Sequence, residues 1–200
     1  TKGVPADGDG GPREGGTMEC IEILKREHQM VRLVIAAARR DLEHAAAAHA
    51  VEPAQAEQLV DFFRYFTNSC HDPKEEDLFF AMLHRRGMAW DGYPLRDLVR
   101  EHAEMRVVLD SASDWLKPAE SGDPAAVEAL LQDLGVYLDL VDAHIDKEED
   151  EVFPLALQWL TAGDLEELSD AFTAIACEEL DEGVHAYYSD LAHHLADTAA

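Results

Sequence analysis

The amino-acid sequence predicts an all-α protein, an antiparallel up-down four-helix bundle with an additional C-terminal helix. Three observations predict this fold class. Apolar residues recur at steps of three and four over long stretches, glycine and proline gather at a few joints, and no stretch has the alternating pattern of a strand. Joints this short between long helices place neighbouring helices antiparallel.

The first three helices are expected at 18–48, 54–86 and 94–117. The first carries an apolar stripe at helical spacing that runs from Ile21 to Ile35. Pro53 precedes the second, and the Gly92-Tyr93-Pro94 stretch separates the second helix from the third. Pro118 is expected to end the third helix, because proline lacks the amide that would continue the hydrogen bonding.

The last two helices are expected at 124–160 and 164–197. Asp123 followed by Pro124 combines a capping residue with proline at the first helical position, and Gly163 supplies a stop before the last helix. The expected organisation is a flexible N-terminal arm or cloning remnant at 1–17, the bundle at 18–160, and the C-terminal helix, packed on the bundle, at 161–200.

The charge balance excludes several classes of function. The 200 residues include 42 Asp and Glu against 16 Lys and Arg, a net charge of −26. Phosphate backbones and anionic lipid surfaces repel such a chain, so we expect neither a nucleic-acid nor a membrane partner. No stretch predicts a membrane span or a secretory signal, which favours the cytoplasm. Cys20, Cys70 and Cys177 are widely spaced, so nitrogen and oxygen are the expected donors for any metal.

The chain contains a weak internal repeat. Arg26-Glu27-His28 followed by Arg32 recurs as Arg100-Glu101-His102 followed by Arg106. Further along each copy, a second histidine is followed at identical spacing by Glu-Glu-Asp and a phenylalanine, as in His71 to Phe80 and His144 to Phe153. Each copy therefore predicts one helical hairpin, with a lone histidine on its first helix and His-x-x-x-Glu on its second.

The repeat predicts a metal site. Residues four apart lie one turn apart on the same face of a helix, so the histidine and glutamate of each His-x-x-x-Glu project together. Two such hairpins in one bundle can aim four imidazoles and two carboxylates at one point in the core. Neutral imidazoles with shared carboxylates suit iron foremost, then manganese or zinc. The expected ligands of one or two metal ions are His28, His71, Glu75, His102, His144 and Glu148.

An acidic residue four positions after a histidine is weak evidence by itself in so acidic a chain. His193 with Asp197 is a third such pair, and it lies outside the repeat. The matched register of the two copies is the feature that chance does not readily supply. Ferritin-like di-iron bundles, the nearest alternative, need a glutamate three residues before the histidine. The sequence lacks this spacing, because those positions hold Lys25, Asn68, Val99 and Val141.

The phrases CHDPKEEDLFF and HIDKEEDEVFP, together with the six expected ligands, resemble the hemerythrin-like family, also called HHE cation-binding domains. The resemblance covers about residues 20–160. It implies a four-helix bundle around two iron ions joined by an oxo or hydroxo bridge (Fe–O–Fe or Fe–OH–Fe), with Glu75 and Glu148 as bridging ligands. Oxygen-carrying hemerythrins have a fifth histidine where this chain has Arg106, so the ligand set of an oxygen carrier is incomplete.

Four further side chains are candidates for an additional ligand or for a supporting contact. Arg32 and Arg106 lie one turn after the lone histidines, and they either hydrogen-bond a carboxylate of the site or form ordinary ion pairs between helices. Tyr137 faces the His144 side of its helix as a gate, a ligand or a core residue. His185 lies in a segment that resembles an extension of some hemerythrin-like proteins, and it either reaches the site or is structural.

Other residues near the repeat motifs are expected to lie outside the centre. Asp72 is expected to approach a metal only if Pro73 disturbs the helix, and both Pro73 and Pro154 are expected to kink their helices. The acidic residues expected on the surface or on a solvated face are Glu27, Glu76, Asp77, Glu101, Glu149 and Asp150.

The sequence favours a redox-active di-iron protein that binds or reacts with oxygen, peroxide or nitric oxide, with peroxide-decomposing, catalase-like activity as its enzymatic form. One alternative is an iron- or oxygen-responsive sensor or an iron store without turnover. Another is a structural acidic bundle that binds a protein partner. The repeat also predicts that the two ends of the centre are nearly alike, His28 with His71 and His102 with His144.

Overall fold

The computed structural model describes residues 19–174, 187–188 and 190–192. These residues form helices and turns without a strand, which confirms the prediction of an all-helical bundle. The N-terminal arm, His185 and most of the last expected helix beyond residue 174 lie outside the described residues. The elements are α1 (Glu19–Ala48), α2 (Pro53–Phe62), the π-helical η1 (Phe63–His71) and η2 (Lys74–Phe79), α3 (Phe80–Arg85), α4 (Leu95–Glu120), α5 (Pro124–Lys147), the π-helical η3 (Glu148–Val152), α6 (Phe153–Trp159) and α7 (Ala162–Ala174).

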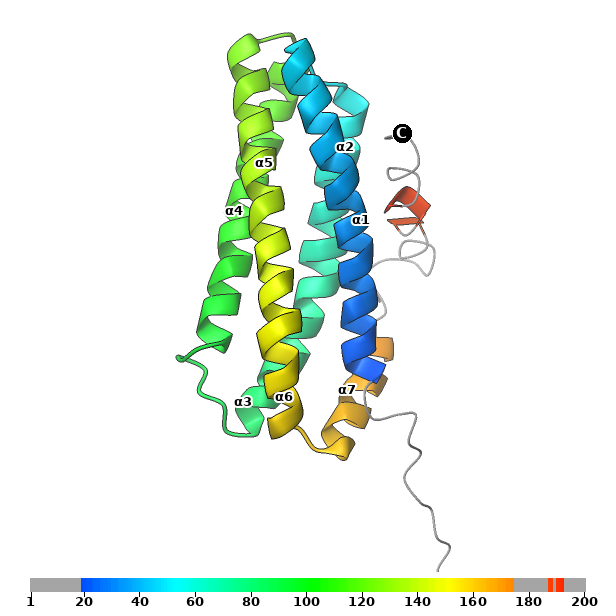
Figure 1. Cartoon of the computed structure of the whole chain (residues 1–200), viewed down its shortest axis with the longest axis vertical. Coiled ribbons are helices and arrows are strands. Elements are labelled where there is room, and N and C mark those ends of the chain that lie inside the picture. Colours follow the sequence, from blue (N-terminus) through cyan, green and yellow to red (C-terminus); the bar gives the residue numbers. More distant parts are fainter. Residues whose placement is uncertain (1–18, 175–186, 189, 193–200) are drawn as a thin grey trace, which may run out of the picture.

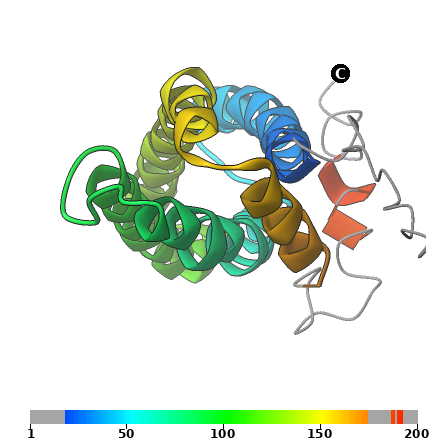
Figure 2. The same ribbon diagram turned by 90° about the horizontal axis from the view of Figure 1, so that it is seen from below.

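The long helices lie side by side along the long axis of the molecule (Figure 1). The run from α2 to α3 is one continuous helical rod, and so is the run from α5 to α6. Seen from the end, these two rods, α1 and α4 enclose a common interior, and α7 lies outside them near α1 (Figure 2). This arrangement brings residues far apart in the sequence to the same level of the interior.

The helix ends follow local chemistry. Asp123 caps α5, because its side chain accepts a hydrogen bond from the amide of Ala125 at 3.0 Å. The expectation that Pro118 ends the third helix is wrong, since α4 continues to Glu120. Proline there removes a single amide in the last turn, and the carbonyl of the exposed Asp114 that loses this partner lies beside water.

Two apolar clusters fill the interior and leave a polar layer between them. One cluster, towards the α1–α2 turn, includes Val34, Phe62 and Leu130. The other, towards the opposite end, includes Leu24 and Phe80. The histidines and glutamates of the repeat lie in sequence between the members of the two clusters on each long helix. Their layer is therefore closed by apolar packing above and below.

The helical rods widen to π-helical turns beside this layer. Each copy of the repeat has a phenylalanine nine residues after its second histidine. The amide of this phenylalanine donates to the carbonyl of the glutamate five residues before it, Phe80 to Glu75 and Phe153 to Glu148. Pro73 directly precedes η2, and Pro154 lies just after η3, so a residue without an amide donor stands next to each of these wider turns. Such turns are frequent at functional sites, and here η1 ends at His71, η2 contains Glu75 and η3 begins at Glu148.

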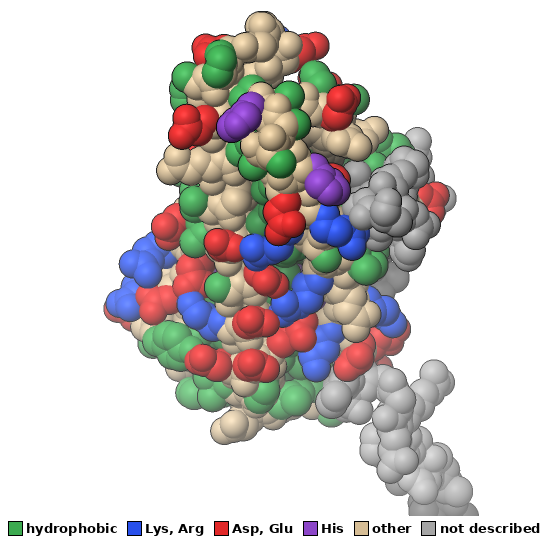
Figure 3. Space-filling model, turned by 45° about the horizontal axis from the view of Figure 1, so that its top comes forward, with side chains coloured by type: hydrophobic (Ala, Val, Ile, Leu, Met, Phe, Trp, Pro, Cys, Tyr) green, Lys and Arg blue, Asp and Glu red, His purple; other side chains and the backbone are tan. Residues whose placement is uncertain are grey.

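The surface is dominated by charge. Acidic and basic side chains are interleaved over much of the face shown in Figure 3. Ion pairs join neighbouring helices at the surface, for example Arg39 on α1 with Asp139 on α5 at 2.6 Å. None of the described helices combines the length and the apolarity that a bilayer crossing requires.

Candidate metal centre

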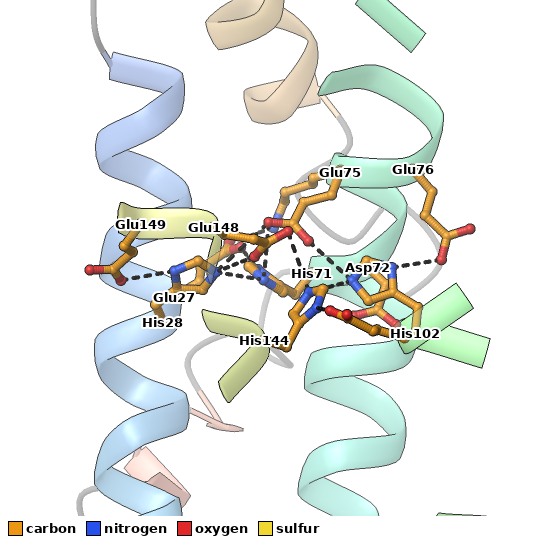
Figure 4. Close-up of polar contacts among 12 residues, drawn as sticks. Glu27, His28, His71, Asp72, Glu75, Glu76, His102, His144, Glu148 and Glu149 are labelled. Atoms are coloured by element: carbon orange, nitrogen blue, oxygen red, sulfur yellow. Dashed lines mark hydrogen bonds and ion pairs between the residues drawn. The ribbon is translucent and has the colours of Figure 1, made fainter. Parts of the chain in front are cut away.

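All six expected ligands meet in the polar layer (Figure 4). They come from α1, η1, η2, α4, α5 and η3, so every long helical rod of the bundle contributes. Their exposed fractions range from 0% to 5%. The helical spacing of the repeat thus brings four imidazoles and two carboxylates together in the core.

One half of the centre contains His28 and His71. Their Nε2 atoms are 3.2 Å apart. Glu75 Oε1 lies 3.5 Å from His71 Nε2 and 3.8 Å from His28 Nε2. Glu148 Oε2 lies 3.3 Å from His28 Nε2. Two ring nitrogens and two carboxylate oxygens therefore converge on one point.

The other half contains His102 and His144, whose Nε2 atoms are 2.8 Å apart. Glu75 Oε2 lies 3.5 Å from His102 Nε2, and Glu148 Oε1 lies 3.3 Å from His144 Nε2. Each glutamate therefore directs one oxygen to each histidine pair. This is the arrangement of two carboxylates that bridge a pair of cations.

The donor set fits metal ions. The four carboxylate oxygens of Glu75 and Glu148 are buried and have no hydrogen-bond partner among the described residues. Leaving them so would be costly without a cation. Donors about 2.1 Å from one ion lie about 3.0–3.4 Å apart at tetrahedral or octahedral angles. The separations in both halves lie close to this range.

A second layer of glutamates orients the four imidazoles. Each Nδ1 contacts a carboxylate at 2.8 to 3.0 Å, so each Nε2 faces the interior of the centre. The expectation of a surface position is wrong for Glu27, which is buried, whereas Glu76, Glu101 and Glu149 are partly exposed and still turn one oxygen inward. Each of these glutamates is adjacent in sequence to one ligand but hydrogen-bonds to a histidine on another helix. The pairs are Glu27–His71, Glu101–His144, Glu149–His28 and Glu76–His102.

Two lysines complete this layer, and the sequence analysis did not single them out. Lys74 donates to Glu27, and Lys147 donates to Glu101. Lys74 is only 2% exposed, which shows that its charge is compensated inside the bundle. The signal was present in the sequence, because a lysine precedes the Glu-Glu pair in both copies of the repeat.

Electrostatics in the layer favour cations. Burial disfavours the charged form of His28, but Glu148 and Glu75 outweigh burial and raise its pKa to about 10. Burial likewise opposes a charge on His144, yet Glu148 and Glu101 raise its pKa to about 9. Burial would raise the pKa of Glu148, whereas His144 and His28 hold it well below its usual range. In the absence of metal ions, protons on the imidazoles would balance the carboxylates.

The two arginines after the lone histidines differ in role. Arg32 pairs with Asp142 and Asp146 on α5 at 2.7 and 2.6 Å, so it forms an ion pair between helices and does not contact the centre. Arg106 donates to Asp72 at 3.0 Å and to Glu76 at 2.9 Å, so it supports the centre.

Tyr137 is completely buried, and its ring packs against Phe63 with centroids 4.8 Å apart. Its hydroxyl has no hydrogen-bond partner among the described residues.

The two ends of the centre have matching ligands, as the repeat predicts, but their surroundings differ. Asp72 follows His71 and is 2% exposed, with one oxygen bound to Arg106. The equivalent position after His144 holds Ile145. A buried carboxylate therefore lies beside one end, and an isoleucine occupies the equivalent position in the other copy.

Comparisons with known proteins agree with this site. The sequence profile of the hemerythrin HHE cation binding domain matches residues 20–156. Curated relatives include uncharacterized proteins of Mycobacterium tuberculosis and Mycobacterium bovis, each 23% identical over 172 residues. The alignments cover 86% of this chain and 65% of each relative, so the chain spans less than two thirds of their length. No solved structure matches the chain with significance.

Proposed function

The chain belongs to the hemerythrin HHE cation-binding domain family, and from this premise we propose that its buried centre holds two iron ions and reacts with small oxidants, above all hydrogen peroxide. The observation that carries the proposal is the pair of carboxylates, Glu75 and Glu148, whose oxygens are shared between two histidine pairs. The proposal includes an antiparallel arrangement of the four long rods, with the segment after residue 160 packed on them.

The charge of the layer supports two ions rather than one. Seven carboxylates belong to the centre and its supporting contacts, and three cationic side chains oppose them. Seven negative against three positive charges leaves a net charge of −4 when the imidazoles are neutral. Two divalent ions balance this charge. The carboxylates are Glu27, Asp72, Glu75, Glu76, Glu101, Glu148 and Glu149, and the cations are Lys74, Arg106 and Lys147.

Three groups of residues would have different roles at the metal centre. The six ligands would hold the ions, and the glutamates on Nδ1 would fix the tautomer and the ring orientation of each histidine. The apolar clusters above and below exclude water from the layer. When bound, a pair of iron ions supplies redox equivalents and open coordination positions for a small oxidant.

Arg106 favours peroxide chemistry over reversible oxygen carriage. Its guanidinium stays protonated and is tied to Asp72 and Glu76, so it cannot serve as a fifth nitrogen ligand. We therefore expect the reduced protein to be oxidised by air, with no spectrum that argon reverses. In the proposed activity, two molecules of hydrogen peroxide yield one molecule of oxygen and two of water.

The test compares iron-loaded wild-type protein with Glu148→Gln and with His44→Ala, a substitution of an exposed histidine outside the layer. Oxygen release from peroxide should occur in the wild type and in His44→Ala, and it should be lost with Glu148→Gln together with bound iron. Full iron loading without peroxide consumption or air oxidation would reject the redox proposal and leave an iron store or sensor.

A further inference from the structure

Three further buried polar atoms have no hydrogen-bond partner among the described residues. They are Thr67 Oγ1, Asp72 Oδ1 and the hydroxyl of Tyr137. Thr67 is 4% exposed and Tyr137 is 0% exposed, so bulk water does not reach these groups freely. A buried polar atom that stays unpaired lowers the stability of the fold. A small molecule that hydrogen-bonds to all three atoms would satisfy them.

The three groups lie in one region of the core. The amide of Asp72 donates to the carbonyl of Thr67 across one π-helical turn of η1. Phe63 begins η1, and its ring packs edge-on against Tyr137. The negative charge of Asp72 reaches the phenol of Tyr137, whose pKa is raised by burial and then by this charge.

This region lies at one end of the centre. Donor atoms of Asp72, Glu76 and His102 are within 4.8 Å of one another, and Figure 4 shows Asp72 beside His102. Arg106 holds the other oxygen of Asp72 at 3.0 Å, which fixes the carboxylate. The two copies of the repeat do not share these groups. The second copy has Leu140 and Ile145 at the positions equivalent to Thr67 and Asp72, and the first copy has Arg64 at the position equivalent to Tyr137.

We propose that Thr67, Asp72 and Tyr137 form a polar chamber that binds hydrogen peroxide at the His102–His144 end of the centre. A carboxylate oxygen accepts a hydrogen bond, whereas a phenol and a threonine hydroxyl both donate and accept. The guest must therefore offer a proton to Asp72 and a lone pair to Tyr137. Hydrogen peroxide and water offer both, whereas oxygen and nitric oxide have no proton to donate. The chamber thus admits peroxide in place of water, discriminates against oxygen and nitric oxide, and makes the centre one-ended, an inference that rests on the proposed function.

The experiment uses zinc-loaded full-length protein, in which peroxide can bind without being reduced. Hydrogen peroxide is titrated while NMR follows the backbone amides of Asp72 and of Gln29, which follows His28 at the other end, and zinc content is measured on the same sample. Intact mass after the titration checks that the cysteines stay reduced. The variants are Asp72→Asn, Tyr137→Phe and Thr67→Val, which change little volume, and Ile145→Val, at the position equivalent to Asp72 in the other copy of the repeat, is the matched control.

A saturable shift at Asp72 and not at Gln29 is expected, with two zinc ions per chain. The dissociation constant for peroxide should rise at least tenfold in Asp72→Asn and Tyr137→Phe and stay unchanged in Ile145→Val. Two bound zinc ions with no saturable shift, with equal shifts at both ends, or with unchanged affinity in the chamber variants would overturn the chamber and leave the metal centre intact. Fewer than two zinc ions in the wild type would overturn the proposed function itself.

Discussion

Raising the pH should destabilise the metal-depleted protein. The pKa of His28 is about 10 and that of His144 about 9 in the folded chain, whereas unfolded histidines titrate near about 6.5. A raised pKa in the folded state stabilises the fold fully below the unfolded pKa, and this contribution is lost as the pH rises through the folded pKa. Between about pH 6.5 and 9, the folded chain therefore holds two protons that the unfolded chain has released.

The expected magnitude is large for one buried layer. Each such proton lowers the free energy of unfolding by about 1.4 kcal/mol per pH unit, so two protons remove about 3 kcal/mol per pH unit. From about pH 7 to 9 the loss is about 5 kcal/mol, comparable with the total stability of many domains. His102 acts in the same direction, because Asp72 and Glu75 outweigh its burial and raise its pKa. Bound metal ions replace these protons, so the loaded protein should lack the slope.

Urea unfolding followed by circular dichroism between pH 7 and 9 measures this slope for metal-depleted and zinc-loaded protein. His28→Gln removes one of the titrating groups. In the metal-depleted protein it should therefore reduce the loss of unfolding free energy by about 1.4 kcal/mol per pH unit. Parallel pH profiles for the depleted and loaded proteins would refute the assignment of the raised pKa values to the metal-binding imidazoles.

Other substitutions probe the supporting contacts and the fold. Glu27→Gln or Glu101→Gln should weaken metal affinity about 10- to 100-fold in a chelator competition, because the Nδ1 partner of a ligand is lost, while the exposed Glu43→Gln should have no effect. Asp123→Ala should lower the free energy of unfolding by about 1 kcal/mol in a urea titration, because the α5 cap is removed. Leu130→Ala should lower it by about 2–5 kcal/mol, since Leu130 is 0% exposed, and a smaller loss would show that the core collapses around the cavity.

The inner donors of the centre could be predicted because they obey helix periodicity. His71 with Glu75 and His144 with Glu148 are each one turn apart, and the repeat supplies the register between hairpins. The structure brings these residues together with His28 and His102 in one buried layer.

The supporting contacts could not be predicted from periodicity on one helix. Glu27 is adjacent to His28 in sequence but binds His71, a contact that depends on how α1 packs against η1. The same holds for Glu76, which crosses to His102 on α4. A repeated Arg-Glu-His and a repeated Lys-Glu-Glu were visible, yet on a chain this acidic a repeated glutamate does not distinguish a buried contact from a solvated face.

The asymmetry of the two ends also required the structure. Arg32 and Arg106 occupy equivalent positions in the repeat, but Asp142 and Asp146 hold the first and Asp72 holds the second. The difference arises because the acidic partners lie on the facing helices, at positions that the repeat does not share.

Native mass spectrometry of the chain expressed with ample iron tests the central claim most directly. The folded protein should carry two iron ions per chain, and Glu75→Gln and His144→Ala should each lower this number while His44→Ala leaves it at two. A folded wild-type chain that carries no transition metal, or that carries one ion unaffected by Glu75→Gln, would contradict a dinuclear centre bridged by Glu75 and Glu148.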